Sequence, residues 1–139
     1  LKDAIKKGAV VLVKKGIPKN LDGNYFEPVI LTNIKKNMKI WQEEVFGPIL
    51  PIMIFETKRE AIELANDTKF GLGSYVFTED KKLFREISLK IKSGNVWMNN
   101  YRYSPNDPFG GYKRSGIGRH HSKHGFYNLC NIKQVSLEK

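Results

Sequence analysis

The fold class is indicated by the stretch Ile49-Leu50-Pro51-Ile52-Met53-Ile54-Phe55, which runs almost at once into Thr57-Lys58-Arg59-Glu60. The first run is nearly continuously apolar, as is typical of a strand buried on both faces. The second fits a capping box, in which the Thr hydroxyl and the Glu carboxylate satisfy backbone donors at the start of a helix. A buried strand followed directly by a helix is predicted here.

The alternation continues toward the C-terminus. The helix is predicted to end near residue 67, residues 74–78 predict a strand, and Asp80 is placed to cap a helix that closes at Gly94. Residues 95–99 predict one more strand. This order predicts an α/β fold with a mostly parallel sheet and flanking helices, joined by right-handed crossovers.

The chain begins on a helical pattern. Leu1, Ala4 and Ile5 lie on one helical face, and Gly8 is placed to end the helix. Because no N-cap precedes Leu1, we expect the chain to begin inside a helix and to be a piece of something longer.

Two further strands are predicted before residue 49. Residues 9–13 form a β-branched run typical of a buried strand, and a loop follows over residues 16–24. Residues 25–32 predict the second strand. Pro28 places it at a sheet edge or an irregular crossing, because proline donates no ladder hydrogen bond.

Length and composition bound the class of protein. With 139 residues, 40% of them apolar, we expect one main folded body. No apolar run approaches the ~18 residues of a membrane span, and residues 1–8 lack the features of a secretory signal. The single cysteine, Cys130, allows no internal disulfide and favours a reducing compartment. We therefore expect a soluble, cytoplasmic protein with no membrane partner.

The charge is strongly basic, with a formal net charge of +10 and a pI near 9.7. A basic surface attracts phosphates, so nucleic-acid binding is one interpretation. The Lys and Arg residues are spread along the chain, mostly as pairs beside apolar runs, which is typical of solvated faces. No nucleic-acid partner is predicted.

Three motifs stand in order along the chain: Glu43-Glu44-Val45-Phe46-Gly47-Pro48, Ala65-Asn66-Asp67-Thr68-Lys69-Phe70-Gly71-Leu72 and Pro108-Phe109-Gly110-Gly111-Tyr112-Lys113-Arg114-Ser115-Gly116-Ile117-Gly118-Arg119. With residues 23–28 and 131–135, they resemble the aldehyde dehydrogenase superfamily over nearly the whole chain. The resemblance is to the C-terminal part of that family, which accounts for a helix that starts at Leu1.

The resemblance implies a mechanism. A cysteine thiolate attacks an aldehyde, the thiohemiacetal passes hydride to NAD or NADP, and water releases the carboxylic acid from a thioester. In the family, the nucleophilic cysteine and the general-base glutamate lie upstream of the part that this chain resembles. No catalytic residue is therefore assigned here, and we expect the chain alone to be inactive. Cys130 matches no catalytic position and is expected to be a small buried apolar residue.

The resemblance also assigns cofactor contacts. It implies that the Glu44 carboxylate accepts hydrogen bonds from the nicotinamide ribose hydroxyls and that Phe46 packs near the nicotinamide ring. Gly47-Pro48 would make a stiff turn that holds both side chains. From spacing alone, Glu43 and Glu44 would instead be a solvated turn.

The loop over residues 101–109 is implied to line the substrate tunnel. Phe109 would form a wall beside the aldehyde, with a loop anchor packed on the core as the alternative. The Ser104 hydroxyl and the Arg102 cation, with Tyr103 beside them, would bind a remote carboxylate. The chain most resembles succinate-semialdehyde dehydrogenases in residues 108–111 and 131–133, while residues 96–99 also resemble betaine-aldehyde dehydrogenases.

Three histidines, His120, His121 and His124, follow the third motif at helical spacing. His120 and His124 are four residues apart, so a metal site is one interpretation. No Cys, Asp or Glu lies nearby to complete a ligand set. A solvated helical face is predicted instead, and no metal.

The closing segment suggests a strand over residues 129–137. The resemblance implies that residues 1–127 are the C-terminal portion of a catalytic domain, and that residues 128–139 join a sheet built across subunits of a homodimer or tetramer. The alternative to an enzyme part is a non-catalytic binding or assembly module that keeps this fold without its chemistry.

Overall fold

The computed structural model describes residues 1–17 and 20–138. They form two compact units, one over Leu1–Ala61 and one that begins at Ile62, where the sequence predicts one main body. The strands belong to two separate sheets, one in each unit. The predicted loop over residues 16–24 includes Pro18 and Lys19, which lie outside the described residues.

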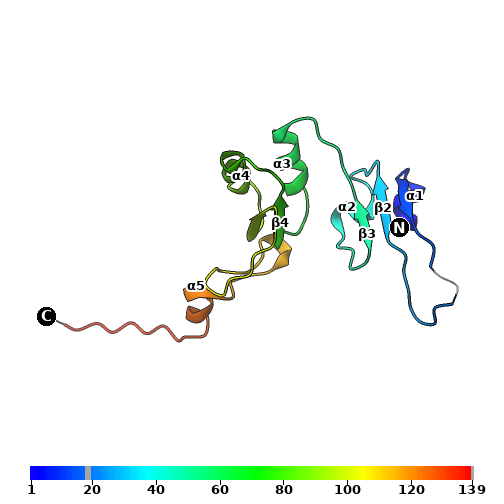
Figure 1. Cartoon of the computed structure of the whole chain (residues 1–139). Coiled ribbons are helices and arrows are strands. Elements are labelled where there is room, and N and C mark those ends of the chain that lie inside the picture. The colour runs from blue at the N-terminus through cyan, green and yellow to red at the C-terminus, as the bar shows by residue number, and fades with distance from the viewer. Residues whose placement is uncertain (18–19, 139) are drawn as a thin grey trace. The chain divides into compact units, whose positions relative to one another are not determined.

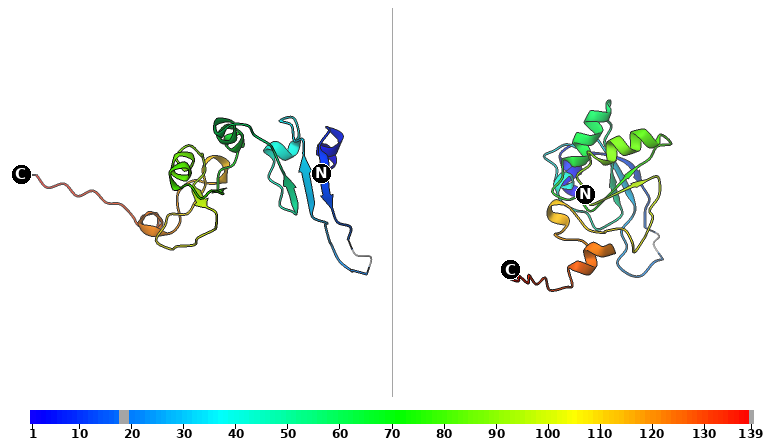
Figure 2. Two further views of the ribbon diagram at one scale, coloured as in Figure 1. Left: turned by 45° about the horizontal axis from the view of Figure 1, so that its top comes forward. Right: turned by 90° about the vertical axis from the view of Figure 1, so that its left-hand side faces the viewer.

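The first unit is built on a three-stranded sheet in the order β1-β2-β3, seen side by side in Figures 1 and 2. Strand β1 (Val10–Lys14) pairs antiparallel with β2 (Val29–Thr32), and β2 pairs parallel with β3 (Ile49–Pro51). A parallel pair needs a long connection, and the segment between β2 and β3 carries helix α2, Lys39–Gln42.

The core of this unit lies between the sheet and helix α1 (Lys2–Lys6). Its buried hydrophobic residues are Ala4, Ala9, Val29, Leu31 and Met38. Leu31 is fully buried, which contributes roughly 1.5–3 kcal/mol relative to an exposed side chain.

Helices α1 and α2 are joined through Asp3. Its Oδ2 accepts a hydrogen bond from the Lys39 backbone N–H at 2.8 Å, and its Oδ1 pairs with Lys7 Nζ at 2.8 Å. These two contacts hold the pKa of the Asp3 carboxyl below its ordinary value of 3.8.

Three expectations for these strands are wrong. The strand at residues 9–13 forms one position later, as β1, but is mostly exposed. The strand predicted over residues 49–55 ends at Pro51, and Ile54 beyond it is 81% exposed. Both are edge strands with one neighbour, so neither is covered on two faces. Pro28 does not mark an edge, because β2 begins after it and is the central strand.

The second unit contains the predicted strand–helix–strand order. Strands β4 (Gly73–Val76) and β5 (Asn95–Met98) pair in parallel, and helix α4 (Lys81–Ser88) connects them. The Asp80 cap is confirmed, since its carboxylate accepts hydrogen bonds from the Lys82 and Leu83 N–H groups at 2.7 and 3.0 Å. The short elements η1 (Lys113–Ser115) and α5 (Ser122–Tyr127) complete the unit.

Helix α3 (Lys58–Asn66) starts at the predicted capping residues. The Thr57 hydroxyl accepts the Glu60 N–H at 3.1 Å, as expected. The Glu60 carboxylate accepts the Glu56 N–H at 2.8 Å, one residue before the expected donor. The capping prediction is therefore confirmed on one side and shifted on the other.

The closing segment carries no helix or strand over residues 129–138, and Figure 1 shows it running on from α5. Ile132 and Leu137 are 95% and 90% exposed. A strand needs a hydrogen-bonding partner strand, and residues 131–138 have none among the described residues of their own unit, so pairing with another subunit stays a prediction. Lys139 lies outside the described residues. In the described part of the chain, no helix has the length and apolarity to cross a membrane.

Candidate functional site

The first predicted site segment lies between α2 and β3. The Ile49 N–H donates to the Gly47 carbonyl at 2.8 Å, which closes a tight turn around Pro48. The Pro48 carbonyl accepts the Val29 N–H at 2.8 Å, so the turn is attached to the central strand β2. The base of the Glu44–Pro48 segment is therefore fixed by backbone contacts at its C-terminal end, as a stiff turn requires.

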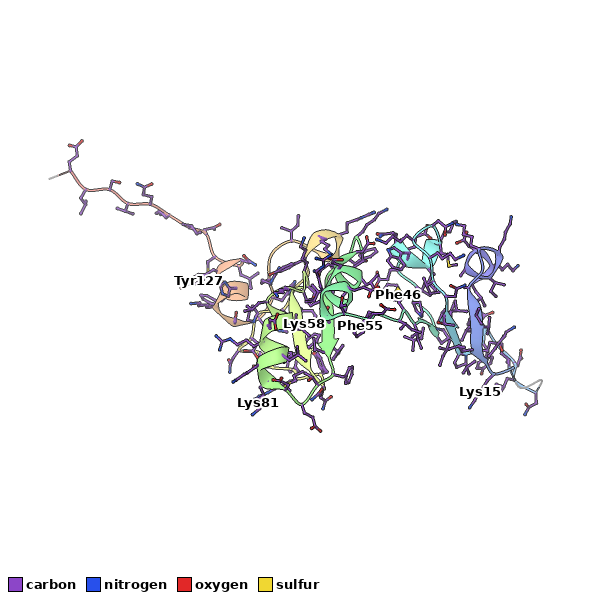
Figure 3. The ribbon with its side chains drawn as sticks, turned by 90° about the horizontal axis from the view of Figure 1, so that it is seen from above. Lys15, Phe46, Phe55, Lys58, Lys81 and Tyr127 are labelled. Atoms are coloured by element: carbon purple, nitrogen blue, oxygen red, sulfur yellow. The ribbon has the colours of Figure 1, made fainter. Side chains whose placement is uncertain are left out.

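Glu44 and Phe46 project from this turn. Both are exposed, and Phe46 keeps 94% of its surface accessible. Figure 3 labels Phe46 among the side chains. An aromatic ring that contacts almost nothing in its own unit is free to pack on another group. A carboxylate two residues away supplies acceptors on the same segment, while Glu43 before it is also exposed.

The second predicted site segment is the loop after β5. The Asp107 N–H donates to the Ser104 carbonyl, and the Asn106 N–H donates to Ser104 Oγ, both at 3.2 Å. Ser104 thus forms a turn inside the loop, and its hydroxyl proton remains available to donate. The loop then closes on His120, which exchanges two backbone hydrogen bonds with Phe109 at 2.9 and 2.7 Å.

The loop folds over a small pocket that brings the predicted substrate residues together. Its walls include all four of them: Arg102, Tyr103, Ser104 and Phe109. Trp97 and Tyr101 add a second aromatic side, with ring centroids 5.1 Å apart. The cavity volume is about 40 Å³, close to one water molecule, so the pocket by itself is too small to hold a small organic molecule.

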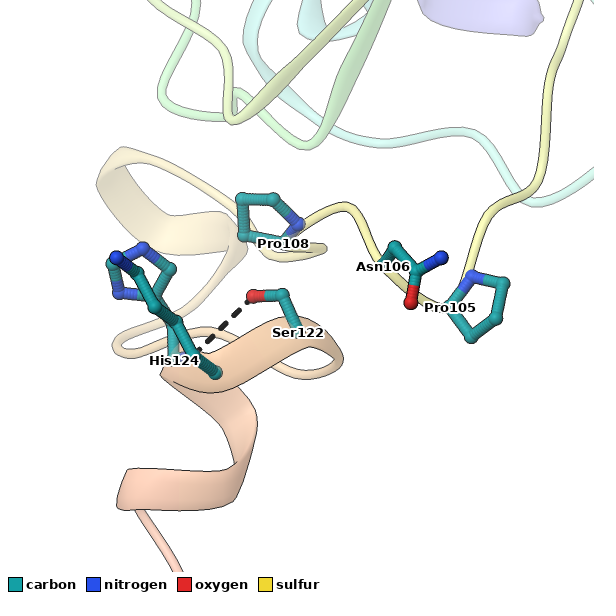
Figure 4. A pocket seen from close by; sticks show the side chains of 6 residues that line it. Pro105, Asn106, Pro108, Ser122 and His124 are labelled. Carbon is teal, nitrogen blue, oxygen red and sulfur yellow. Dashed lines mark hydrogen bonds between the residues drawn. The ribbon is translucent and has the colours of Figure 1, made fainter.

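A second, wider hollow with a volume of about 620 Å³ borders the same loop. Figure 4 shows this hollow from close by. It is lined by Pro105, Asn106, Pro108, Ser122, Lys123 and His124. Figure 4 shows the Ser122 hydroxyl close to the backbone of His124, whose N–H donates to it at 3.3 Å. This hollow contains no aromatic ring other than the imidazole.

Two of the three motifs meet in the second unit. The Gly71 N–H donates to Ser115 Oγ at 2.9 Å, although the residues are 44 positions apart. Asn95 Nδ2 donates to the Leu72 and Gly110 carbonyls at 2.9 and 3.1 Å. These contacts attach the end of the substrate loop to the β4–β5 sheet.

Glycine is required at position 94, where the backbone comes closest to the end of the loop. A Cβ on Gly94 would overlap the Gly110 carbonyl oxygen. The two backbones therefore approach at a distance that only an absent side chain permits.

The histidines and the cysteine differ from their predictions. Helix α5 starts at Ser122, so His120 and His121 precede it and the three histidines share no helical face. In the described part of the chain, no three metal-ligating side chains gather. Cys130 is exposed rather than buried, and among the described residues its N–H and thiol donate only to carbonyls of the preceding helix α5, those of Tyr127 at 3.1 Å and Phe126 at 3.5 Å.

Three residues of the pocket lie outside the predicted loop: Asn95, Trp97 and His121. The sequence predicts Asn95 and Trp97 only as strand residues and His121 only as part of a solvated helical face. The His121 side chain reaches the pocket because His120 pairs with Phe109, and the Trp97 side chain reaches it from the end of its strand. The spacing of residues along the sequence reveals neither contact.

The whole chain was compared with known families and structures. The model of the aldehyde dehydrogenase family matches residues 1–135. The chain belongs to the aldehyde dehydrogenase family.

Relatives in this family include enzymes from plants. The chain is 43% identical over 137 residues to a chloroplastic betaine aldehyde dehydrogenase of Beta vulgaris, covering 97% of this chain and 27% of that protein. It is 42% identical over 138 residues to the peroxisomal aminoaldehyde dehydrogenase 1 of Pisum sativum, covering 98% and 27%. The chain thus spans about a quarter of the length of these aldehyde dehydrogenases.

Solved aldehyde dehydrogenase structures agree in fold. A Mycobacterium tuberculosis aldehyde dehydrogenase in complex with NAD⁺ superposes with a TM-score of 0.85 at 38% identity, over 91% of this chain and 26% of that one. A Staphylococcus aureus betaine aldehyde dehydrogenase in complex with NAD⁺ gives 0.83 at 42% identity, over 91% and 26%. Three of these four relatives are named for betaine or amino aldehydes and none is named for succinate semialdehyde, so the narrower resemblance to succinate-semialdehyde dehydrogenases gains no support from them.

Proposed function

We propose that this chain is part of an enzyme that oxidises an aldehyde to the carboxylic acid with a nicotinamide cofactor. The observation that carries the proposal is the family match over residues 1–135, joined to a substrate loop whose four predicted residues line one pocket. The cysteine nucleophile and the glutamate base come from the rest of the enzyme, so the residues of this chain bind and orient rather than react.

On the cofactor side, the residues present fit a nicotinamide nucleotide. Glu44 offers two carboxylate oxygens to neighbouring ribose hydroxyls, and Phe46 offers an open aromatic face. The attached Gly47–Pro48 turn holds both at fixed positions. When bound, the cofactor accepts hydride from the substrate. NAD⁺ in the related structures supports NAD as the cofactor, with NADP as the alternative.

On the substrate side, two chemistries compete for the pocket. Arg102 and the Ser104 hydroxyl suit a remote carboxylate, as in succinate semialdehyde. The aromatic rings, with Asp107 among the lining residues, suit a cationic group, since ammonium ions bind over aromatic faces. The plant and staphylococcal relatives are named for betaine or amino aldehydes, which supports the second substrate class.

The test is an assay of the protein as its source makes it. Reduction of NAD⁺ and NADP⁺ is followed with succinate semialdehyde, betaine aldehyde and butanal, which carry a negative, a positive and no remote charge. A kcat/KM at least about ten-fold higher for one charged aldehyde than for butanal assigns the pocket to that charge. No reduction with any of the three aldehydes would contradict the proposal.

The closing segment supports a further part of the proposal. Its exposed apolar residues suit pairing with a second copy, so we expect the enzyme to be a homodimer or tetramer joined through residues 128–139. A non-catalytic assembly module remains the alternative, and the same assay separates the two. We also propose a cytoplasmic location for this protein. The two plant relatives differ in this respect, since they are named as chloroplastic and peroxisomal.

A further inference from the structure

We propose that His121 is a positioning residue of the substrate pocket, whose ring holds Tyr103 and Phe109 in place. This inference rests on the proposed function, because it assigns a role in the pocket that the function gives to those two side chains.

The ring contacts support this role. The His121 ring stands at 88° to the Tyr103 ring, with centroids 5.4 Å apart. Its centroid lies 6.1 Å from that of Phe109, with the planes tilted by 39°. Both separations fall in the range of attractive aromatic pairs. One half-buried imidazole therefore links two rings that stand six residues apart on the loop.

The backbone around His121 fixes the direction of its ring. On one side, His120 exchanges two hydrogen bonds with Phe109. On the other side, the Ser122 N–H donates to the Pro105 carbonyl at 2.9 Å. His121 is thus held between two attachments to the substrate loop, with its ring directed into the pocket that the loop covers.

The conformation of His121 is unfavourable for a residue with a side chain. Its φ of 61° and ψ of 173° lie in a region that almost only glycine adopts. Glycine would relieve this strain, so the imidazole is not explained by backbone stability. Strained backbone of this kind is characteristic of functional sites, where the surrounding structure holds it in place.

The experiment compares two variants of the protein as its source makes it. In His121→Gly the ring is lost and the strain is relieved. We expect the KM for the aldehyde to rise about three- to ten-fold, because the ring contacts with Tyr103 and Phe109 are lost. The kcat and the KM for NAD⁺ should stay within about two-fold, and the thermal midpoint should be unchanged or raised. In His121→Phe the ring is kept, so the KM should stay near that of the parent while the midpoint falls.

The matched control is His124→Ala, an exposed histidine whose side chain lies outside this pocket. It should leave both KM values unchanged. An active parent with an unchanged aldehyde KM in His121→Gly overturns this inference alone. If His121→Gly lowers the thermal midpoint and leaves the aldehyde KM unchanged, the role of His121 is merely structural and the inference is overturned as well. A parent that oxidises no aldehyde overturns the proposed function, and the inference with it.

Discussion

At the scale of single residues, the proposed function rests on side chains that the fold leaves exposed. Phe46 is almost fully accessible, and Glu44 lies beside it on a turn whose base is fastened to β2. Exposure of a large apolar ring normally costs stability or marks a contact surface. Because the turn is attached to β2, a contact surface is the better explanation for the exposure of Phe46.

Replacing Glu44 with Gln removes a charge and keeps the shape of the side chain. Hydrogen bonds to a charged group are stronger than neutral ones, so the KM for NAD⁺ should rise about ten-fold with kcat changed much less. Initial-rate kinetics of the full enzyme measure both constants. Glu43→Gln is the control, since that carboxylate is exposed one residue away, and equal effects of the two variants would refute the assignment.

Replacing Gly94 with Ala tests the close approach beneath the substrate loop. The new Cβ meets the Gly110 carbonyl, so one of the two backbones must shift. We expect the free energy of unfolding to fall by about 1–3 kcal/mol, measured by denaturant titration. Gly16→Ala is the control because no heavy atom lies within 4 Å of its added Cβ. A Gly94 variant as stable as this control would contradict the packing argument.

At the scale of elements, helices follow their local signals more closely than strands follow theirs. The Asp80 cap and the Thr57 hydroxyl bond form as predicted because both involve residues within three positions. Strand burial depends on what covers each face. The apolar run at residues 49–55 therefore gave the right strand start and the wrong burial.

The contribution of the Asp3 contacts between α1 and α2 to the free energy of unfolding should depend on pH. The folded state lowers the pKa of Asp3, so its contribution to stability is present above the unfolded pKa near 3.8 and is lost as pH falls through the lower folded value. The difference in unfolding free energy between the parent and Asp3→Asn should therefore be present at pH 6 and shrink as the pH falls below 3.8. Denaturant titrations across this range measure it. Asp22→Asn, at an exposed carboxylate, is the matched control variant, and a constant difference for Asp3 would refute the linkage.

At the scale of the whole molecule, the chain leaves much apolar surface without a partner. Ile54 and Phe77 are 81% and 77% exposed, and the tail carries Ile132 and Leu137 in the open. Monomeric proteins rarely expose so many large apolar residues. The chain spans 27% of the length of the betaine aldehyde dehydrogenase of Beta vulgaris, and the longer enzyme proposed above would cover such faces.

The tail prediction concerns assembly. Val135→Asp places a charge in the segment predicted to pair with another subunit, so the oligomer should dissociate or lose affinity by at least about ten-fold. Light scattering after size exclusion, over a range of protein concentrations, measures the mass. Gln134→Asp adds the same charge at a residue that is already polar. If both variants keep the parent mass, the segment does not join the subunits.

The sequence by itself determined the family, the order of helices and strands from α3 to β5, and the capping residues, because each depends on neighbouring positions or on motifs fixed in order. Only the tertiary structure decided which strands are central, which are exposed, and which side chains share a pocket. His121 joins Tyr103 and Phe109 through backbone pairing between residues 11 positions apart, and Gly94 is needed because Gly110 approaches it. Burial and aromatic contact arise between segments distant in sequence, and a local pattern does not specify which segments meet.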